Sequence, residues 1–216
     1  MKAPTARAGP AYDSTMRVFV AGATGVIGSR IVPLLVGEGH VVAGMTRTAG
    51  KADLIRSAGA EPVVCDVYAA DALSAAVQAF RPDLVLHLLT DLPDDPAELP
   101  ARLSGNARIR VEGTRNLLAA AKAGGGEGFL AESVAWPMPP GEGADAVAEL
   151  ERTVLGFGGV VLRFGQLYGP GTYYPDSVPT DPRVHVDAAA RAAVAAIGHA
   201  TGVLTITDAG TAEQTA

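Results

Sequence analysis

Three evenly spaced glycines near the start of this 216-residue chain constrain its fold more than any other feature. An apolar, β-branched run, Val18–Ala21, stops at the first of them, and an apolar pattern typical of a helix follows the last. This order predicts a strand, a tight turn and a helix. We expect Gly22 to let the chain turn sharply, Gly25 to let a ligand approach the backbone, and Gly28 to let the helix pack closely on the sheet.

The spacing Gly-x-x-Gly-x-x-Gly between a strand and a helix is a variant of the dinucleotide-binding fingerprint. The first turn of a helix carries free backbone N–H groups and the positive end of the helix dipole. A pyrophosphate would meet these groups from Val26 onward. The sequence therefore predicts a dinucleotide site at this turn.

Composition limits the other partners of the chain. The formal charge is −6 with no long run of either sign, which argues against a nucleic-acid partner. The single cysteine, Cys65, excludes an internal disulfide, and we expect a reducing, cytoplasmic setting. No apolar run is long enough to span a membrane, so no membrane partner is expected. The four histidines are spread along the chain and predict packing or hydrogen-bonding roles, with no metal site.

Strand and helix patterns alternate along residues 16–208, which predicts a single α/β domain with a Rossmann-type, doubly wound parallel sheet of about seven strands. We expect residues 1–15 to be a disordered tail and residues 209–216 to be a frayed polar tail. After the first strand, the expected strands cover residues 40–45, 62–65, 83–89, 128–133, 160–163 and 203–207. After the first helix, the expected helices cover residues 49–58, 71–80, 101–123, 144–155 and 187–199, with Asp71 as an N-cap.

The end of the second strand bears on the choice of dinucleotide. An acidic residue there binds the ribose 2′-hydroxyl of NAD, but residues 45–48 contain none. Arg47 can instead pair with the 2′-phosphate of NADP, with help from the Thr46 hydroxyl. We therefore favour NADP(H) over NAD(H). The alternative interpretation of Arg47 is an ordinary solvated arginine.

Two polar residues follow or end later strands, at the edge where a ligand would bind. Asp66 follows the third strand and could bind an adenine amino group, or it could stabilise a turn. Ser133 ends the fifth strand and could polarise a substrate carbonyl, although a serine at a strand end is also ordinary. The chain has no Gly-x-Ser-x-Gly elbow that would indicate a hydrolase.

Taken together, these features make the chain resemble the extended short-chain dehydrogenase/reductase superfamily, in its NAD-dependent epimerase/dehydratase branch. The matching segments are 22–28, 66–67, 84–88, Asn106 with 111–118, 162–170 and 185–187. The resemblance implies a small-molecule substrate and a homodimer formed through helices 101–123 and 144–155. It also implies cofactor contacts at Gly22, Thr24, Gly25, Val26, Ile27, Gly28, Thr46, Arg47, Asp66, Val67, Leu88, Leu89, Thr90, Asn106 and Gln166.

The chain departs from this family where redox chemistry is performed. Members that transfer hydride carry Tyr-x-x-x-Lys on the helix after the fifth strand, with the tyrosine as acid and base. Matching the Glu151–Arg152 pair of that helix puts Gly143 and Val147 at these positions, and neither can do that work. The substrate-binding segments near residues 136–144 and 169–186 are also abbreviated. Candidate replacements are Ser133 to orient a carbonyl and Tyr173 or Tyr174 to donate a proton.

Three hypotheses follow from the match and the departure. The first is an NADPH-favouring oxidoreductase of the epimerase/dehydratase type that acts on a small carbonyl or alcohol through an atypical active site. The second is a dinucleotide-binding sensor or regulator without turnover, which the missing tyrosine and lysine favour. The third is a partner subunit with an empty cleft, because a fold alone does not give a function.

Overall fold

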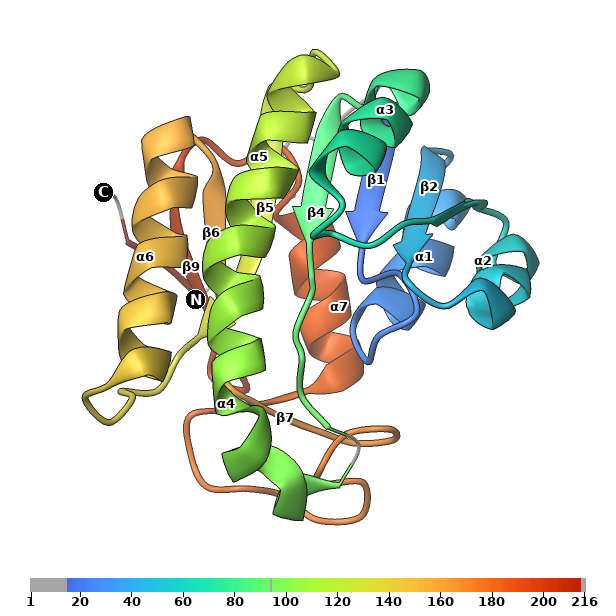
Figure 1. Ribbon diagram of the computed structural model, residues 1–216. Helices are drawn as coiled ribbons and strands as arrows, with labels where there is room; N and C mark the ends of the chain where they lie inside the picture. The colour runs from blue at the N-terminus through green and yellow to red at the C-terminus, as the bar shows by residue number, and fades with distance from the viewer. Residues whose placement is uncertain (1–14, 94, 215–216) are drawn as a thin grey trace, which may run out of the picture.

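The computed structural model describes residues 15–93 and 95–214. The predicted N-terminal tail, residues 1–15, lies outside the described residues except for Thr15. One open sheet forms the centre, and helices cover both of its faces (Figure 1). The carboxyl ends of the parallel strands share one edge, at the bottom of this view.

The sheet has eight strands in the order β10-β9-β6-β5-β4-β1-β2-β3. All neighbours are parallel except the pair β9 and β10. The order reverses between β1 and β4, and ligands of such sheets bind beyond the carboxyl ends at this point. The strands are β1 Arg17–Ala21, β2 Val41–Thr46, β3 Glu61–Val64, β4 Leu84–His87, β5 Gly128–Val134, β6 Val160–Phe164, β9 Gly202–Thr207 and β10 Gly210–Gln214.

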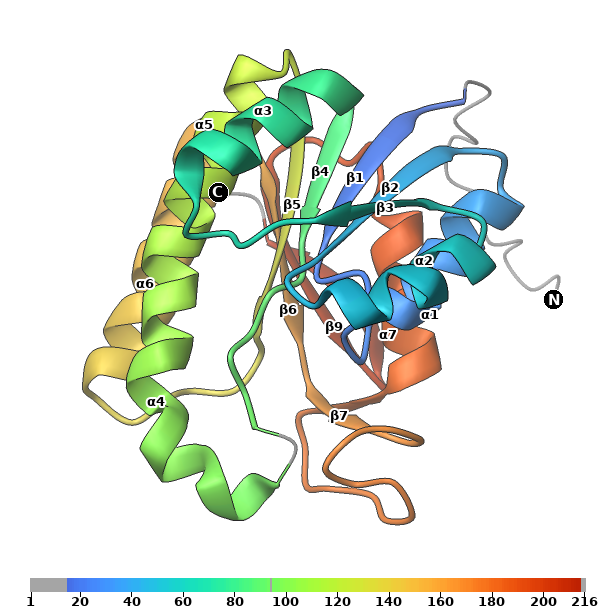
Figure 2. The ribbon, with the colours of Figure 1, turned by 45° about the vertical axis from the view of Figure 1, so that its right-hand side comes forward.

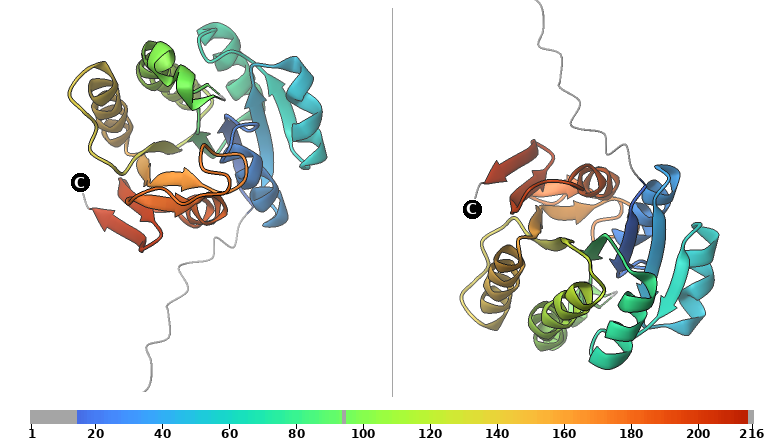
Figure 3. Two further views of the ribbon diagram at one scale, coloured as in Figure 1. Left: turned by 90° about the horizontal axis from the view of Figure 1, so that it is seen from below. Right: turned by 90° about the horizontal axis from the view of Figure 1, so that it is seen from above.

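Helices α3, α5 and α6 cover one face, and α1, α2 and α7 cover the other (Figures 2 and 3). Two apolar cores result, since alternate residues of each strand face opposite sides. The helices are α1 Gly28–Gly37, α2 Ala52–Ser57, α3 Ala70–Phe80, α4 Leu99–Arg108, α5 Thr114–Ala123, α6 Glu142–Phe157 and α7 Val186–Ala195. The single-turn elements are η1 Ala49–Lys51, η2 Pro96–Glu98 and the π-helical η3 Ile109–Gly113, which joins α4 to α5.

A small second sheet lies beyond the carboxyl edge. Its parallel strands are β7 Gln166–Tyr168 and β8 Arg183–His185, and the segment between them extends past the ends of the main strands (Figure 2). This segment falls within residues 169–186, one of the two ranges expected to be an abbreviated substrate-binding segment.

Three expectations need correction. The tail predicted over residues 209–216 contains strand β10, which pairs with β9 through a turn where Gly210 has φ +114°. Its side chains are all exposed, so it lacks the apolar signal by which a strand is recognised. The main sheet therefore has eight strands, one more than expected. Asp71 is not the N-cap of α3, because that position belongs to Ala69 and Asp71 lies within the first turn.

Candidate dinucleotide site at the carboxyl edge of the sheet

The glycine turn leaves β1 and enters α1 with little room around two of its three glycines. Gly22 has φ +92°, and a Cβ there would lie 2.6 Å from the carbonyl oxygen of Leu88. A Cβ on Gly28 would lie 2.1 Å from the carbonyl oxygen of Gly22. The third glycine therefore allows α1 to pack against the turn itself, rather than against the sheet as its position suggested.

Gly25 differs from the other two glycines. It is exposed, and the one close contact of a Cβ there would be the Gly22 carbonyl oxygen at 3.2 Å. Its face toward solvent is therefore open to a ligand. The first turn of α1 contains no acidic residue that would repel a phosphate. These features fit a dinucleotide pyrophosphate.

The end of β2 lies against the glycine turn. The Thr24 hydroxyl donates to the Thr46 hydroxyl over 3.3 Å, and the backbone N–H of Ala23 donates to the carbonyl of Met45. Val26 is exposed next to them, whereas the Ile27 side chain is buried in the core. Ile27 can therefore offer a ligand only its backbone.

Arg47 follows β2 and reaches across the edge of the sheet. Its guanidinium lies 3.3 Å from the carboxylate of Asp91, and its side chain is 67% exposed. Such an exposed pair is weak, so a phosphate could replace the carboxylate. Sequence reasoning missed Asp91, although its place shortly after the fourth strand was a usable signal. Its backbone N–H donates to Asn106 Oδ1, which fixes this loop against α4.

The remaining predicted cofactor residues lie at three separate places, after β3, after β4 and on β7. Asp66 is exposed after β3, where its carboxylate accepts the backbone N–H of Tyr68, so it does stabilise a turn. Val67 is buried beside it, Leu88 is buried after β4, and Leu89 and Thr90 are partly buried. Gln166 lies on β7, where its amide donates to the carbonyl of Thr180.

Ser133 points away from the glycine turn, toward α6. Its hydroxyl donates to Glu151 Oε1 over 2.6 Å, and Glu151 forms a bidentate ion pair with Arg163 of β6. Burial raises the pKa of Glu151, but the hydrogen bonds from Arg163 and Ser133 outweigh it, so the net pKa is below its usual value. The Ser133 hydroxyl thus serves a buried network that joins β5, β6 and α6.

The two candidate tyrosines lie in the segment between β7 and β8. The Tyr173 hydroxyl donates to the carbonyl of Pro93, in the loop after β4. The Tyr174 hydroxyl donates to Gln166 Oε1 over 3.4 Å. Both phenols are partly buried and hold this segment in place.

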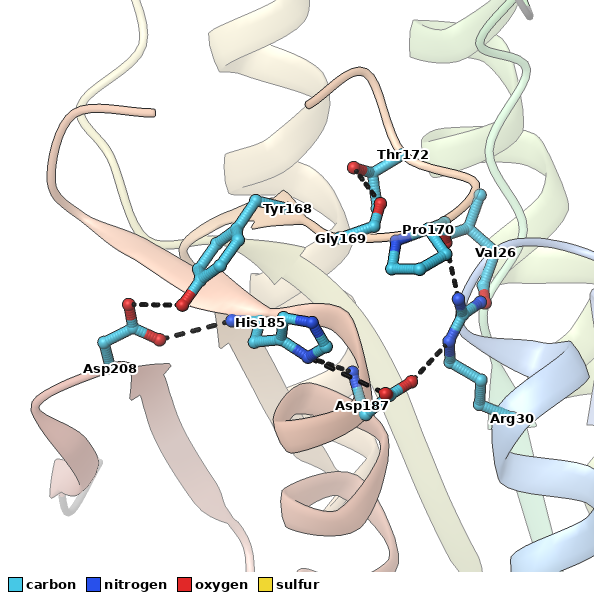
Figure 4. A network of polar contacts seen from close by, with 9 residues as sticks. All are labelled: Val26, Arg30, Tyr168, Gly169, Pro170, Thr172, His185, Asp187 and Asp208. Carbon is cyan, nitrogen blue, oxygen red and sulfur yellow. Dashed lines mark hydrogen bonds and ion pairs between the residues drawn. The ribbon is translucent and has the colours of Figure 1, made fainter. Parts of the chain in front are cut away.

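Arg30 ties the glycine turn to this same segment (Figure 4). Its guanidinium pairs with Asp187 at the start of α7 over 2.7 Å and donates to the carbonyls of Val26 and Pro170. His185 accepts the backbone N–H of Asp187. Sequence reasoning singled out residues 185–187 but missed Arg30, whose signal is its position two residues after the last glycine.

Two titratable groups, the buried His87 and the partly buried Glu132, lie near the ends of β4 and β5. The His87 ring is 3.0 Å from the Thr114 hydroxyl and accepts the backbone N–H of Leu89, so it has the predicted hydrogen-bonding role. Burial, followed by the charge of Arg110, lowers the pKa of His87 to about 3. Burial raises the pKa of Glu132 to about 7, and Arg110 opposes this rise. Sequence reasoning did not assign Glu132 a role, although an acid inside an apolar strand was a signal.

A pocket of about 320 Å³ opens beside the end of β5. It is lined by Val134, Ala135, Trp136, Pro137, Met138, Ala144, Val147, Ala148, Glu151 and Arg163. Helix α6 forms one wall, and no residue of this helix is a tyrosine or a lysine. Within the described residues, no group of three or more His, Cys, Asp or Glu side chains could hold a metal ion. In the same part of the chain, no helix is both long and apolar enough to cross a membrane.

Comparison with solved structures confirms the fold. UDP-glucose 4-epimerase from Thermotoga maritima matches 92% of this chain and 79% of its own with a TM-score of 0.75 at 20% identity. The NAD complex of the Thermus thermophilus enzyme matches with a TM-score of 0.71 at 22% identity. The chain therefore has the fold of these solved epimerases.

Sequence comparison defines the family. Residues 18–142 match the model of the NAD dependent epimerase/dehydratase family, and the chain belongs to this family. A 3-diazoavenalumate denitrifying reductase from a Streptomyces species is 40% identical over 238 residues, which cover 89% of this chain and 76% of that protein. The match is longer than this whole chain, so the reductase carries insertions relative to it. Family and relative together support an NAD(P)-binding oxidoreductase.

Proposed function

We propose that this chain is a reductase that uses NADPH in preference to NADH and acts on a small electrophilic molecule. The observation that carries the proposal is the open glycine turn at the reversal of strand order, with the exposed guanidinium of Arg47 at the end of β2. When bound, the reduced nicotinamide supplies a hydride from its C4 atom.

Each part of the edge has a proposed role in holding the dinucleotide. The backbone after Gly25 would bind the pyrophosphate, and Arg47 would exchange Asp91 for the 2′-phosphate. Asp66 and Val67, which follow β3 at the carboxyl edge, would contact the adenine. The nicotinamide end would be lined by Leu88, Leu89, Thr90, Asn106 and Gln166.

The reductase relative favours a diazo compound as the substrate class, with a small carbonyl compound as the second choice. A neutral diazo carbon takes up one hydride and one proton and releases N₂. A carbonyl takes the hydride at carbon and the proton at oxygen and becomes an alcohol. Both reductions therefore need a proton donor, and α6 offers no tyrosine or lysine for this purpose.

The absence of these two residue types from α6 also favours a second function, a dinucleotide-binding regulator without turnover. The two proposals agree on cofactor binding and differ on hydride transfer. An experiment that follows the hydride itself separates them.

The chain should be mixed with NADPH carrying deuterium at C4 and with a panel of aryl diazo and carbonyl compounds. We expect loss of reduced-nicotinamide absorbance and one deuterium in the product by mass spectrometry. Gly25→Val is the control, because it should close the open face of the turn and stop the reaction. Tight NADPH binding without deuterium transfer to any compound would instead support the regulator.

A further inference from the structure

We propose that the Glu132 carboxyl group faces the nicotinamide end of the cofactor site and exchanges the proton that accompanies hydride transfer. This inference rests on the proposed function, since a proton donor is needed only if the chain is a reductase. Three observations support it: the face on which Glu132 lies, the lack of a hydrogen-bond partner, and its surroundings.

The alternation of β5 places Glu132 on the face of the glycine turn. Phe129 belongs to the core on the α5 and α6 side, whereas Leu130 belongs to the core that includes Ile27 and Leu88. Ser133 lies on the same face as Phe129, as its hydrogen bond to Glu151 of α6 confirms. Glu132 lies on the same face as Leu130. Its position near the carboxyl end of β5 puts it beside the point where the strand order reverses.

No hydrogen bond within residues 15–93 and 95–214 accounts for an acid at this place, and the charge that acts on Glu132 is that of Arg110. Among the described residues, no hydrogen bond involves its carboxylate, whereas Glu151 and Glu149 each bind two partners. Its neighbours in register on β6 and on the continuation of β4 are Leu162 and Leu88, both buried and apolar. A carboxyl group kept in such a place without a partner is available to a ligand.

The surroundings also suit proton exchange near neutral pH. Burial raises the pKa of Glu132 to about 7, so both of its forms are populated there. The charged group that acts on it is Arg110 of η3. His87 and the Glu151–Arg163 pair lie on the opposite face of the sheet, and the Arg30–Asp187 pair holds the glycine turn. In the reaction, the carboxyl O–H bond breaks as the substrate takes up the hydride, and the carboxylate regains a proton from water.

A binding experiment tests this placement without any substrate. The oxidised nicotinamide ring is positively charged and the reduced ring is neutral, so a nearby Glu132 carboxylate should favour the oxidised form. We expect the affinity ratio of oxidised to reduced dinucleotide to rise about fivefold between pH 6 and pH 8, toward the tenfold limit of a shift of about one pKa unit. Calorimetry gives this ratio when the oxidised and reduced forms of one dinucleotide are titrated. The dinucleotide used is NADP or NAD, whichever binds more tightly.

Glu132→Gln should make the ratio independent of pH while dinucleotide binding persists. Glu127→Gln, which removes an exposed acid before the opposite end of β5, is the matched control and should behave as wild type. A ratio in the wild-type chain that does not change with pH would overturn the placement of Glu132, whether or not the chain is a reductase.

Turnover gives the second readout once a substrate is found. Hydride transfer in the wild type should slow as pH rises through about 7. In Glu132→Gln, the rate of hydride transfer should fall about 100-fold or more, and it should no longer depend on pH in this range. Glu132→Asp should recover part of the rate. Full activity in Glu132→Gln would contradict the proton-exchange role and leave the reductase proposal standing. A wild-type chain with the expected ratio but no turnover would contradict the reductase proposal and leave the placement of Glu132 standing.

Discussion

At the scale of single residues, the carboxyl edge combines groups held for structure with groups left open to a ligand. Ser133 lies at a strand end where a catalytic role was predicted, yet its hydroxyl bonds inside the protein, as does the His87 ring. Three other residues have fewer contacts inside the protein: Gly25, Arg47 and Glu132. The proposed chemistry therefore depends on this second group.

Arg47 should determine the preference for NADPH. Arg47→Ala removes the cation expected to bind the 2′-phosphate, and a hydrogen bond to a charged group contributes about 1.5–3 kcal/mol. We therefore expect NADPH affinity to fall about 10- to 100-fold in calorimetry, with NADH affinity unchanged. Arg56→Ala on α2, which also removes an exposed arginine paired with an aspartate, is the control. Equal losses for both nucleotides would mean that Arg47 does not bind the phosphate.

His87 should make the fold sensitive to acid. Its folded pKa of about 3 lies below the usual value near 6.5, so it stabilises the fold above pH 6.5, and this contribution is lost as pH falls toward 3. In urea titrations between pH 7 and pH 4, the free energy of unfolding of His87→Gln should fall by about 1 kcal/mol less per pH unit than that of wild type. The carboxylates contribute equally to both proteins, so the difference reports on His87. Parallel pH profiles would show that His87 is not held neutral in the fold.

At the scale of elements, we propose that the glycine turn serves architecture and binding through different residues. Gly22 and Gly28 have backbone atoms within 3 Å of any added Cβ, so larger residues there disturb the fold. Gly25 has only one contact, at 3.2 Å. A substitution at Gly25 can therefore separate binding from folding.

Gly25→Val should abolish binding of either dinucleotide while leaving the fold largely intact. The added side chain occupies the open face that a pyrophosphate would approach. Circular dichroism and thermal unfolding check the fold, and calorimetry checks binding. Gly28→Ala is the contrasting variant and should lower the unfolding temperature. Undiminished affinity in a folded Gly25→Val variant would show that the turn is not used for binding.

The sequence allowed the parallel sheet to be predicted because its central strands, such as β1 and β4, are buried and read as continuous apolar runs. Strand β10 could not be found in this way, since its exposed residues Gly210–Gln214 carry no apolar pattern. The cofactor turn was recognisable from local spacing. The orientation of Glu132 depends on the alternation of side chains along β5. The partner of Ser133 is Glu151 of α6, which lies 18 residues away in the sequence, so local spacing could not reveal it.

At the scale of the whole molecule, we predict a homodimer, with the interface on residues 101–123 (α4, η3 and α5) and on α6, as the family resemblance implies. A groove between these helices is lined by Ala107, Arg108, Val111, Glu142, Asp145, Ala146 and Glu149. Leu103 of α4 is 54% exposed, an apolar side chain that a second copy could cover. Light scattering should give twice the 21.9 kDa mass of the chain, and Leu103→Glu should reduce it. A monomer at micromolar concentration would refute this assembly.

The central claim is that the carboxyl edge of this sheet binds a nicotinamide dinucleotide and distinguishes NADPH from NADH. The most direct test is calorimetric titration of the wild-type chain with each nucleotide. We predict saturable binding of NADPH and much weaker binding of NADH, because only the former offers Arg47 a 2′-phosphate. Absence of binding for both nucleotides would contradict the claim and leave the glycine turn with an architectural role only.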